Sequence, residues 1–255
     1  MNVQNENKND RLHAALAAET RAEMGPHTES ATERTKRLTT VAMLSAVAYL
    51  LVFLSHMVPI KVEGFLNYDP SDIVTVIGGF LLGPLTALLI SFVVSFVEFI
   101  TVSSTGVIGL IMNILSTVSF ACVAAFIYKK KQTRFVAVVA LLSGTLAMTV
   151  VMLLWNYIIT PLYMAVPRAQ VAGMLLTVFL PFNLLKGALN AAVTLLLYKP
   201  LVTALRRARF IAPARIGAPD LKRPPGRAAI VLIPALAAVV LLTCVLFLLA
   251  WTGVL

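Results

Sequence analysis

The chain has 255 residues, of which 59% are hydrophobic and 13% are charged, and its formal net charge at pH 7 is +10. A soluble domain of this length could not bury so much apolar surface, whereas membrane spans of about 20 apolar residues account for it. The basic residues cluster between the apolar runs. This distribution follows the positive-inside rule of membrane proteins and argues against a nucleic-acid partner.

Residues 1–37 are polar and mixed in charge, so we expect a disordered cytosolic tail. A first membrane span is predicted over residues 38–57. The apolar run over residues 73–100 is too long for one helix and contains Gly83-Pro84, which is a strong turn signal. It therefore predicts a short, glycine-rich helix and a second helix, joined by a tight turn.

Three further spans are predicted over residues 107–128, 135–159 and 174–198. The fifth span is expected to end before Pro161, because proline interrupts helices. The spans together define a six-helix membrane domain over residues 38–207. A basic, proline-rich linker over residues 208–227 leads to a seventh span within residues 228–255. The basic residues of the loops predict a cytoplasmic N-terminus and a C-terminus outside.

Neither a metal site nor ATP hydrolysis is indicated. Cys122 and Cys244 lie within apolar runs, and the three histidines are scattered without ligand spacing. The chain contains no nucleotide-binding loop of the G-x-x-x-x-G-K-[ST] type. We therefore expect no cofactor and no enzymatic activity, and any active transport would draw energy from a partner chain or an ion gradient.

Lys186 is the most informative polar residue, because it lies inside an apolar stretch. A lysine at the centre of a membrane helix costs about 2.5–3.5 kcal/mol, so such a residue usually faces a bundle interior or a cavity and has a partner. Asn183 lies three positions earlier, on the same helical face. The pair predicts a polar ligand site, with a purely structural role as the alternative.

Further polar residues are expected to converge on the outer half of the bundle. They are Asp69, Asp72, Glu98, Asn113, Asn156 and Asn190. Asp72 could instead cap a helix N-terminus, and Glu98 could extend to the membrane interface. Asn113 and Asn190 are expected to form interhelical hydrogen bonds.

Several short motifs resemble those of one membrane-protein family. They are YDPSD at 68–72, IGGF at 77–80, GP at 83–84, WNY at 155–157, PLY at 161–163 and LPFNLLKG at 180–187. Over about residues 37–207 the chain resembles the substrate-binding S components of energy-coupling-factor (ECF) vitamin transporters, and among them the riboflavin-specific members. The resemblance implies a six-helix bundle that captures the vitamin at the outer face of the membrane and delivers it inward.

The resemblance also implies roles for individual residues. Asn156, Asn183 and Lys186 are expected to hydrogen-bond the flavin ring, whose polar edge offers carbonyls, a ring nitrogen and one N–H. Aromatic residues could cover the ring faces, and the candidates are Phe65, Tyr68 and Tyr157. Asp69 or Glu98 could accept hydrogen bonds from the ribityl hydroxyls. Replacing Lys186 with Met should then weaken binding without unfolding the bundle.

The expected partners are a coupling membrane subunit and two cytosolic ATPases. Ala42 and Ala46 form a small-xxx-small pattern on the first span, which matches the family's docking surface for the coupling subunit. The seventh span lies outside the family pattern. Two alternatives stay open: an S component for a different vitamin, and an intramembrane lipid-modifying enzyme. The enzyme would need clustered acidic or nucleophilic residues at the cytoplasmic face, which the sequence does not show.

Overall fold

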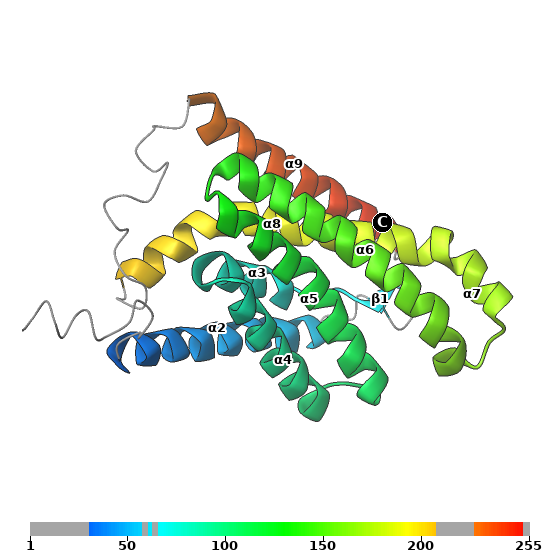
Figure 1. Ribbon diagram of the computed structural model, residues 1–255. Coiled ribbons are helices and arrows are strands. Elements are labelled where there is room, and N and C mark those ends of the chain that lie inside the picture. Colours follow the sequence, from blue (N-terminus) through cyan, green and yellow to red (C-terminus); the bar gives the residue numbers. More distant parts are fainter. Residues whose placement is uncertain (1–30, 58–60, 63–65, 208–226, 252–255) are drawn as a thin grey trace, which may run out of the picture. The chain divides into compact units, whose positions relative to one another are not determined.

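The computed structural model describes residues 31–57, 61–62, 66–207 and 227–251 (Figure 1). The chain divides into two compact units, Met1–Leu38 and Thr39–Leu255. The described part of the second unit is a helical membrane domain with one very short hairpin, in which β1 (Lys61–Val62) pairs antiparallel with β2 (Leu66–Asn67).

The described helices are α2 (Ala31–Met57), α3 (Ser71–Leu82), α4 (Pro84–Thr101), α5 (Gly106–Lys130), α6 (Arg134–Met164), α7 (Arg168–Met174), the π-helical turn η1 (Leu175–Phe179), α8 (Leu180–Arg207) and α9 (Arg227–Trp251). From α3 to α8 the helices follow one another with short connections.

Five of the described helical stretches are long and apolar enough to cross a membrane. They are Glu33–Met57, Pro84–Thr101, Gly106–Lys130, Arg134–Met164 and Arg168–Leu205. The 12 residues of α3 would extend only about 18 Å, which is less than the roughly 30 Å of hydrocarbon in a bilayer. The prediction of an all-helical, multi-pass membrane protein is confirmed.

The predicted turn between α3 and α4 is also confirmed. Gly83 adopts φ 102°, a conformation that side chains with a Cβ rarely reach, and its N–H donates to the Gly79 carbonyl at 2.9 Å. Pro84 then occupies the first turn of α4, where a missing N–H costs nothing. The two residues together end one helix and begin the next.

Three helix ends differ from the predictions. α2 begins at Ala31, so residues 31–37 are helical, while residues 1–30 of the expected tail lie outside the described residues.

α6 continues past Pro161 to Met164 and ends at Ala165, which has φ 53°. A proline this close to a helix end removes only one backbone N–H donor, so the last turn can persist. The sixth predicted span begins earlier, because α7 and η1 continue into α8.

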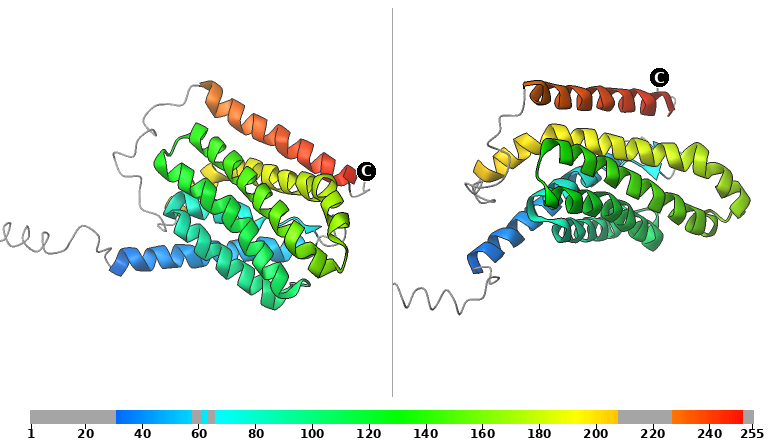
Figure 2. Two further views of the ribbon diagram at one scale, coloured as in Figure 1. Left: turned by 45° about the vertical axis from the view of Figure 1, so that its right-hand side comes forward. Right: turned by 45° about the horizontal axis from the view of Figure 1, so that its top comes forward.

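Small residues bring α5 and α6 close together, and the two helices lie side by side in Figures 1 and 2. Ala121, Ala124 and Ala125 on α5 are fully buried. A Cβ added at Gly144 on α6 would come within 2.5 Å of the Phe120 carbonyl oxygen, which belongs to the backbone of α5. Close packing of this kind is the main source of helix association in membranes.

We therefore expect Gly144→Ala to lower the melting temperature of the purified protein in detergent. The added methyl group would force two backbones apart, and overpacking of this type costs about 1–3 kcal/mol. Gly173→Ala on α7 is the matched control, because a Cβ there meets no atom within 4 Å. Equal melting temperatures for the two variants would contradict the close approach of α5 and α6.

The C-terminal helix α9 packs along α8 and buries Ala237 and Cys244. The linker predicted over residues 208–227 lies almost entirely outside the described residues. α9 lies where the seventh span was predicted, and its described apolar stretch is Ile233–Leu246, so a seventh crossing of the membrane stays a prediction.

Candidate ligand-binding site

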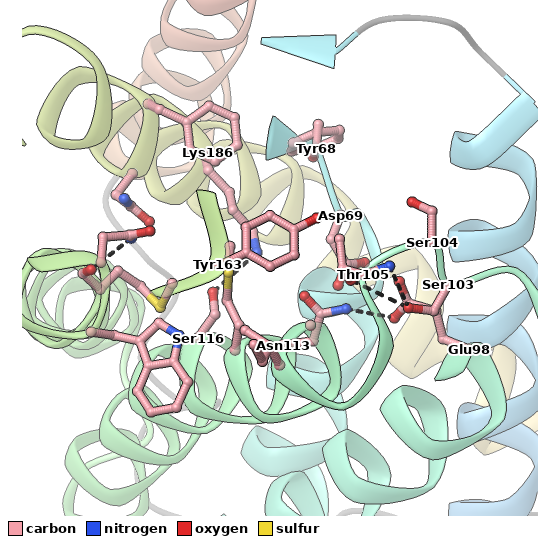
Figure 3. Close-up of a pocket in the computed structure, with 18 of the residues that line it drawn as sticks. Tyr68, Asp69, Glu98, Ser103, Ser104, Thr105, Asn113, Ser116, Tyr163 and Lys186 are labelled. Atoms are coloured by element: carbon pink, nitrogen blue, oxygen red, sulfur yellow. Dashed lines mark hydrogen bonds between the residues drawn. The ribbon is translucent and has the colours of Figure 1, made fainter. Parts of the chain in front are cut away.

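A pocket opens between helices α2, α4, α5, α6 and α8 and the segment that precedes α3 (Figure 3). It encloses about 1010 Å³ of empty space, counting the solvent at its mouth. Six of the residues predicted from the sequence line it: Tyr68, Asp69, Glu98, Asn156, Asn183 and Lys186.

Two predicted residues are not among those that line the pocket. Phe65 lies outside the described residues. Tyr157 is 43% exposed and points away, since consecutive residues of a helix differ by about 100° in direction. Trp155 and Tyr163 of the same helix do line the pocket. The helical period was a signal for Tyr163, which stands seven positions, or about two turns, after Asn156, but it gave no signal for Trp155.

The two pocket asparagines are held by the backbone of their own helices. Asn156 Nδ2 donates to the Met152 carbonyl at 2.7 Å, and Asn183 Nδ2 donates to the Phe179 carbonyl at 2.8 Å. Because a carbonyl can only accept, these contacts fix which end of each amide is nitrogen. Asn156 Oδ1 accepts from the Thr160 hydroxyl at 3.0 Å. Among the described residues, none donates to Asn183 Oδ1, which leaves it available as an acceptor.

The π-helical turn η1 lies immediately before this asparagine. The Phe179 carbonyl, which accepts from Asn183 Nδ2, belongs to this turn. The Leu180 N–H donates to the Leu175 carbonyl, five residues earlier in the chain. π turns of this type are frequent at functional sites, because they change the direction in which the following side chains project. The sequence contained no signal for the turn.

The ammonium group of Lys186 is held by two side chains, of which Ser116 lines the pocket and Asp72 does not. Its Nζ lies 3.2 Å from Asp72 Oδ2 and donates to Ser116 Oγ at 3.1 Å. Lys186 is 7% exposed and Asp72 is completely buried. An ammonium has three N–H donors, so these contacts leave one donor for a ligand. The expected partner of the membrane lysine is therefore Asp72.

Asp72 also bonds to two other helices. Its Oδ1 accepts from Thr117 on α5 at 2.6 Å, and its Oδ2 accepts from Asn190 on α8 at 3.0 Å. Asn190 Oδ1 in turn accepts from the Tyr68 hydroxyl at 2.7 Å. Burial, followed by the nearby Asp72 carboxylate, raises the pKa of the Tyr68 phenol, so the phenol stays protonated and donates.

These contacts exclude the alternative that Asp72 caps a helix. The N-cap position of α3 is Pro70, and the carboxylate that bonds to the first turn belongs to Asp69, whose Oδ1 accepts from the Ser71 N–H at 2.8 Å. They also correct the expectation that Lys186→Met spares the bundle, because removing the ammonium would strand a buried carboxylate.

A second group of polar residues lies to one side of Lys186. Figure 3 shows Asp69, Glu98 and Thr105 together there. Glu98 Oε2 accepts from Asn113 Nδ2 at 2.9 Å, and Glu98 Oε1 lies 3.8 Å from His56 Nε2. Asn113 and Asn190 thus both form the interhelical hydrogen bonds that were expected. His56 is a pocket residue that the sequence did not single out, because it lies near the end of its span without an obvious partner.

Comparison with known proteins places this architecture in a family. A model of the family described as "ECF transporter, substrate-specific component" matches residues 36–198. The riboflavin transporter RibU of Staphylococcus aureus (strain TCH60) is 32% identical over 181 residues, which cover 69% of this chain and 95% of that protein. The riboflavin transporter FmnP of Bacillus subtilis (strain 168) is 31% identical over 194 residues, covering 69% and 99%.

A solved structure gives the same result. The S component of a bacterial ECF transporter superposes with a TM-score of 0.58 at 31% sequence identity, covering 68% of this chain and 99% of that chain. The matched family region ends at residue 198, so α9 lies beyond it.

Proposed function

Because the chain belongs to the substrate-specific components of ECF transporters, we propose that it binds riboflavin in the pocket between α2, α4, α5, α6 and α8. The relatives at 31–32% identity that are named riboflavin transporters support this ligand. Since its relatives are transporters, the chain serves as a transport component rather than an enzyme.

The observation that carries the proposal is the pattern of donors and acceptors left over in the pocket. Asn183 Oδ1 is an available acceptor, and Lys186 retains one N–H donor. Asn156 retains the second N–H of its amide. The pyrimidine edge of riboflavin carries one N–H between two carbonyls, so it can donate to Asn183 while its acceptors face the two donors.

The rest of the pocket suits the other parts of the ligand. Aromatic and apolar side chains, which include Trp155, Tyr163 and Phe182, can lie against the faces of the flavin ring. Asp69 and Glu98 lie on the other side of Lys186, where their carboxylates can accept hydrogen bonds from ribityl hydroxyls. Tyr157 has no part in this arrangement.

Titration of the purified full-length protein tests the choice of vitamin. Quenching of riboflavin fluorescence should reveal one saturable site, and thiamine or biotin in large excess should not displace the flavin. Displacement of riboflavin by one of these vitamins at equal concentration would reassign the ligand. Absence of riboflavin binding to a protein with a cooperative melting transition would refute the proposal.

In the membrane, the pocket is proposed to open outward, with the N-terminus in the cytoplasm and the C-terminus of α9 outside. The asymmetry of basic residues between the loops supports this orientation. Membership of the family supports a complex with a coupling membrane subunit and two cytosolic ATPases, which would drive delivery of the vitamin inward.

Ala42 and Ala46 are proposed to contact the coupling subunit. Both are exposed on α2, four residues apart on one face, and small residues let another helix approach closely. Replacing both with Leu should abolish riboflavin uptake by cells while leaving the affinity of the purified protein unchanged. Val150→Leu, at an exposed position of α6, is the control and should leave both quantities unchanged. Normal uptake by the double alanine variant would remove the assignment.

The linker and α9 are proposed to be separable from binding. The family match ends before them, and none of the described side chains of α9 lines the pocket. A chain truncated after about Arg209 should bind riboflavin with unchanged affinity, measured by the same titration. A folded truncated protein without affinity would show that α9 contributes to the site.

A further inference from the structure

Asp72 lies outside the pocket but is connected to two of its walls. Its carboxylate pairs with Lys186 and accepts from Asn190, which itself accepts from Tyr68. Lys186 and Tyr68 line the pocket, whereas Asp72 and Asn190 do not. A single carboxylate, completely buried, therefore contacts one lining residue, Lys186, directly and another, Tyr68, through Asn190.

We propose that Asp72 is a positioning residue for ligand binding, which acts through Lys186 and never touches the ligand. This inference rests on the proposed function, since its effect is read through riboflavin. Thr117 completes the arrangement, because its hydroxyl donates to Asp72 Oδ1 at 2.6 Å and fixes the carboxylate from the side of α5.

The first part of the argument concerns the direction of Lys186. A lysine side chain has four flexible bonds, and an unanchored ammonium would lose much of its conformational entropy on binding a ligand. Asp72 and Ser116 anchor two of the N–H donors at 3.2 and 3.1 Å. The third donor then points toward the pocket before the ligand arrives, and this preorganisation raises affinity.

The second part concerns charge. Among the described residues that line the pocket, Lys186 is the only Lys or Arg, and the carboxylate of Asp72, 3.2 Å away, compensates its charge. The lysine therefore offers a hydrogen bond without an excess of positive charge. An uncharged heteroaromatic edge fits such a site better than a carboxylate or a phosphate, which would place a second anion beside the first.

A double-mutant cycle tests whether Asp72 acts through Lys186. Asp72→Asn should weaken riboflavin binding about tenfold in the wild-type background, because it removes the anchor of a charged donor. In the Lys186→Met background the same substitution should change affinity by less than about twofold, since the side chain it positions is gone. A purely structural role for Asp72 predicts equal fold-changes in both backgrounds and would overturn the inference.

The absorption spectrum of bound riboflavin gives a second readout, because the visible bands respond to hydrogen bonds on the ring. Thr117→Val removes the hydroxyl that supports Asp72 and should shift the bands and lower affinity several-fold. Thr75→Val is the matched control: this threonine is also fully buried, but its hydroxyl bonds to the Ser71 carbonyl of its own helix. Identical spectra and affinities for the two variants would contradict the proposal.

The outcomes also separate this inference from the proposed function. Failure of the wild-type protein to bind riboflavin would refute the function. Binding by the wild type with additive effects in the cycle would refute only the role of Asp72.

If Asp72→Asn does not fold, Thr117→Val, measured with and without Lys186→Met, replaces it in the cycle. Its effect should likewise vanish in the Lys186→Met background, and a persisting effect would overturn the inference.

Discussion

Replacing Lys186 with Met should lower both the affinity for riboflavin and the stability of the protein. The affinity falls because the complex loses a charge-assisted hydrogen bond, worth about 1.5–3 kcal/mol, or roughly ten- to hundredfold in Kd. The stability falls because Asp72, which is completely buried, loses the ammonium 3.2 Å away. Breaking a buried ion pair by removing one partner costs about 3–5 kcal/mol.

The two effects can be separated by measuring thermal melts and riboflavin titrations on the same samples. Adding Asp72→Asn to Lys186→Met removes the stranded charge, so the double variant should recover most of the lost melting temperature. It should not recover affinity, because the donor to the ligand is still missing. Recovery of both quantities would show that Lys186 only supports the fold, and unchanged affinity in Lys186→Met would exclude it from the site.

Asn183→Leu should have the second-largest effect on binding. The substitution removes the acceptor Oδ1 and leaves the N–H of the flavin ring buried without a partner, which costs about 1–3 kcal/mol, or roughly five- to hundredfold in Kd. The bundle should stay folded, because leucine is apolar and only one hydrogen bond, to the Phe179 carbonyl, is lost. Leu184→Ala, at an exposed position next along α8, is the control and should bind normally. Equal affinity of both variants would contradict the assignment.

The sequence predicted the features that local chemistry determines. Gly83-Pro84 indicated the break between α3 and α4, because only a few residue types tolerate that backbone geometry. The cost of a charge in hydrocarbon identified Lys186 as a buried residue in need of a partner. The spacing of three residues placed Asn183 beside it, and the structure has both in one pocket.

The features that escaped prediction depend on how the helices are rotated and paired. Asp72 stands at the start of its helix, where capping was an equally good interpretation, and only the packing of α3 against α8 shows that it faces Lys186. Tyr157 follows Asn156 directly, but the rotation of α6 turns its side chain outward. The π turn η1 depends on contacts rather than on residue type.

The most direct test of the account compares riboflavin with its N3-methyl derivative on the wild-type protein and on Asn183→Leu. Methylation removes the one N–H of the flavin edge, so it should weaken binding to the wild type by about tenfold or more. It should cost little in Asn183→Leu, which has lost the acceptor for that N–H. An equal loss on methylation in both proteins would contradict the placement of the flavin edge against Asn183 and Lys186.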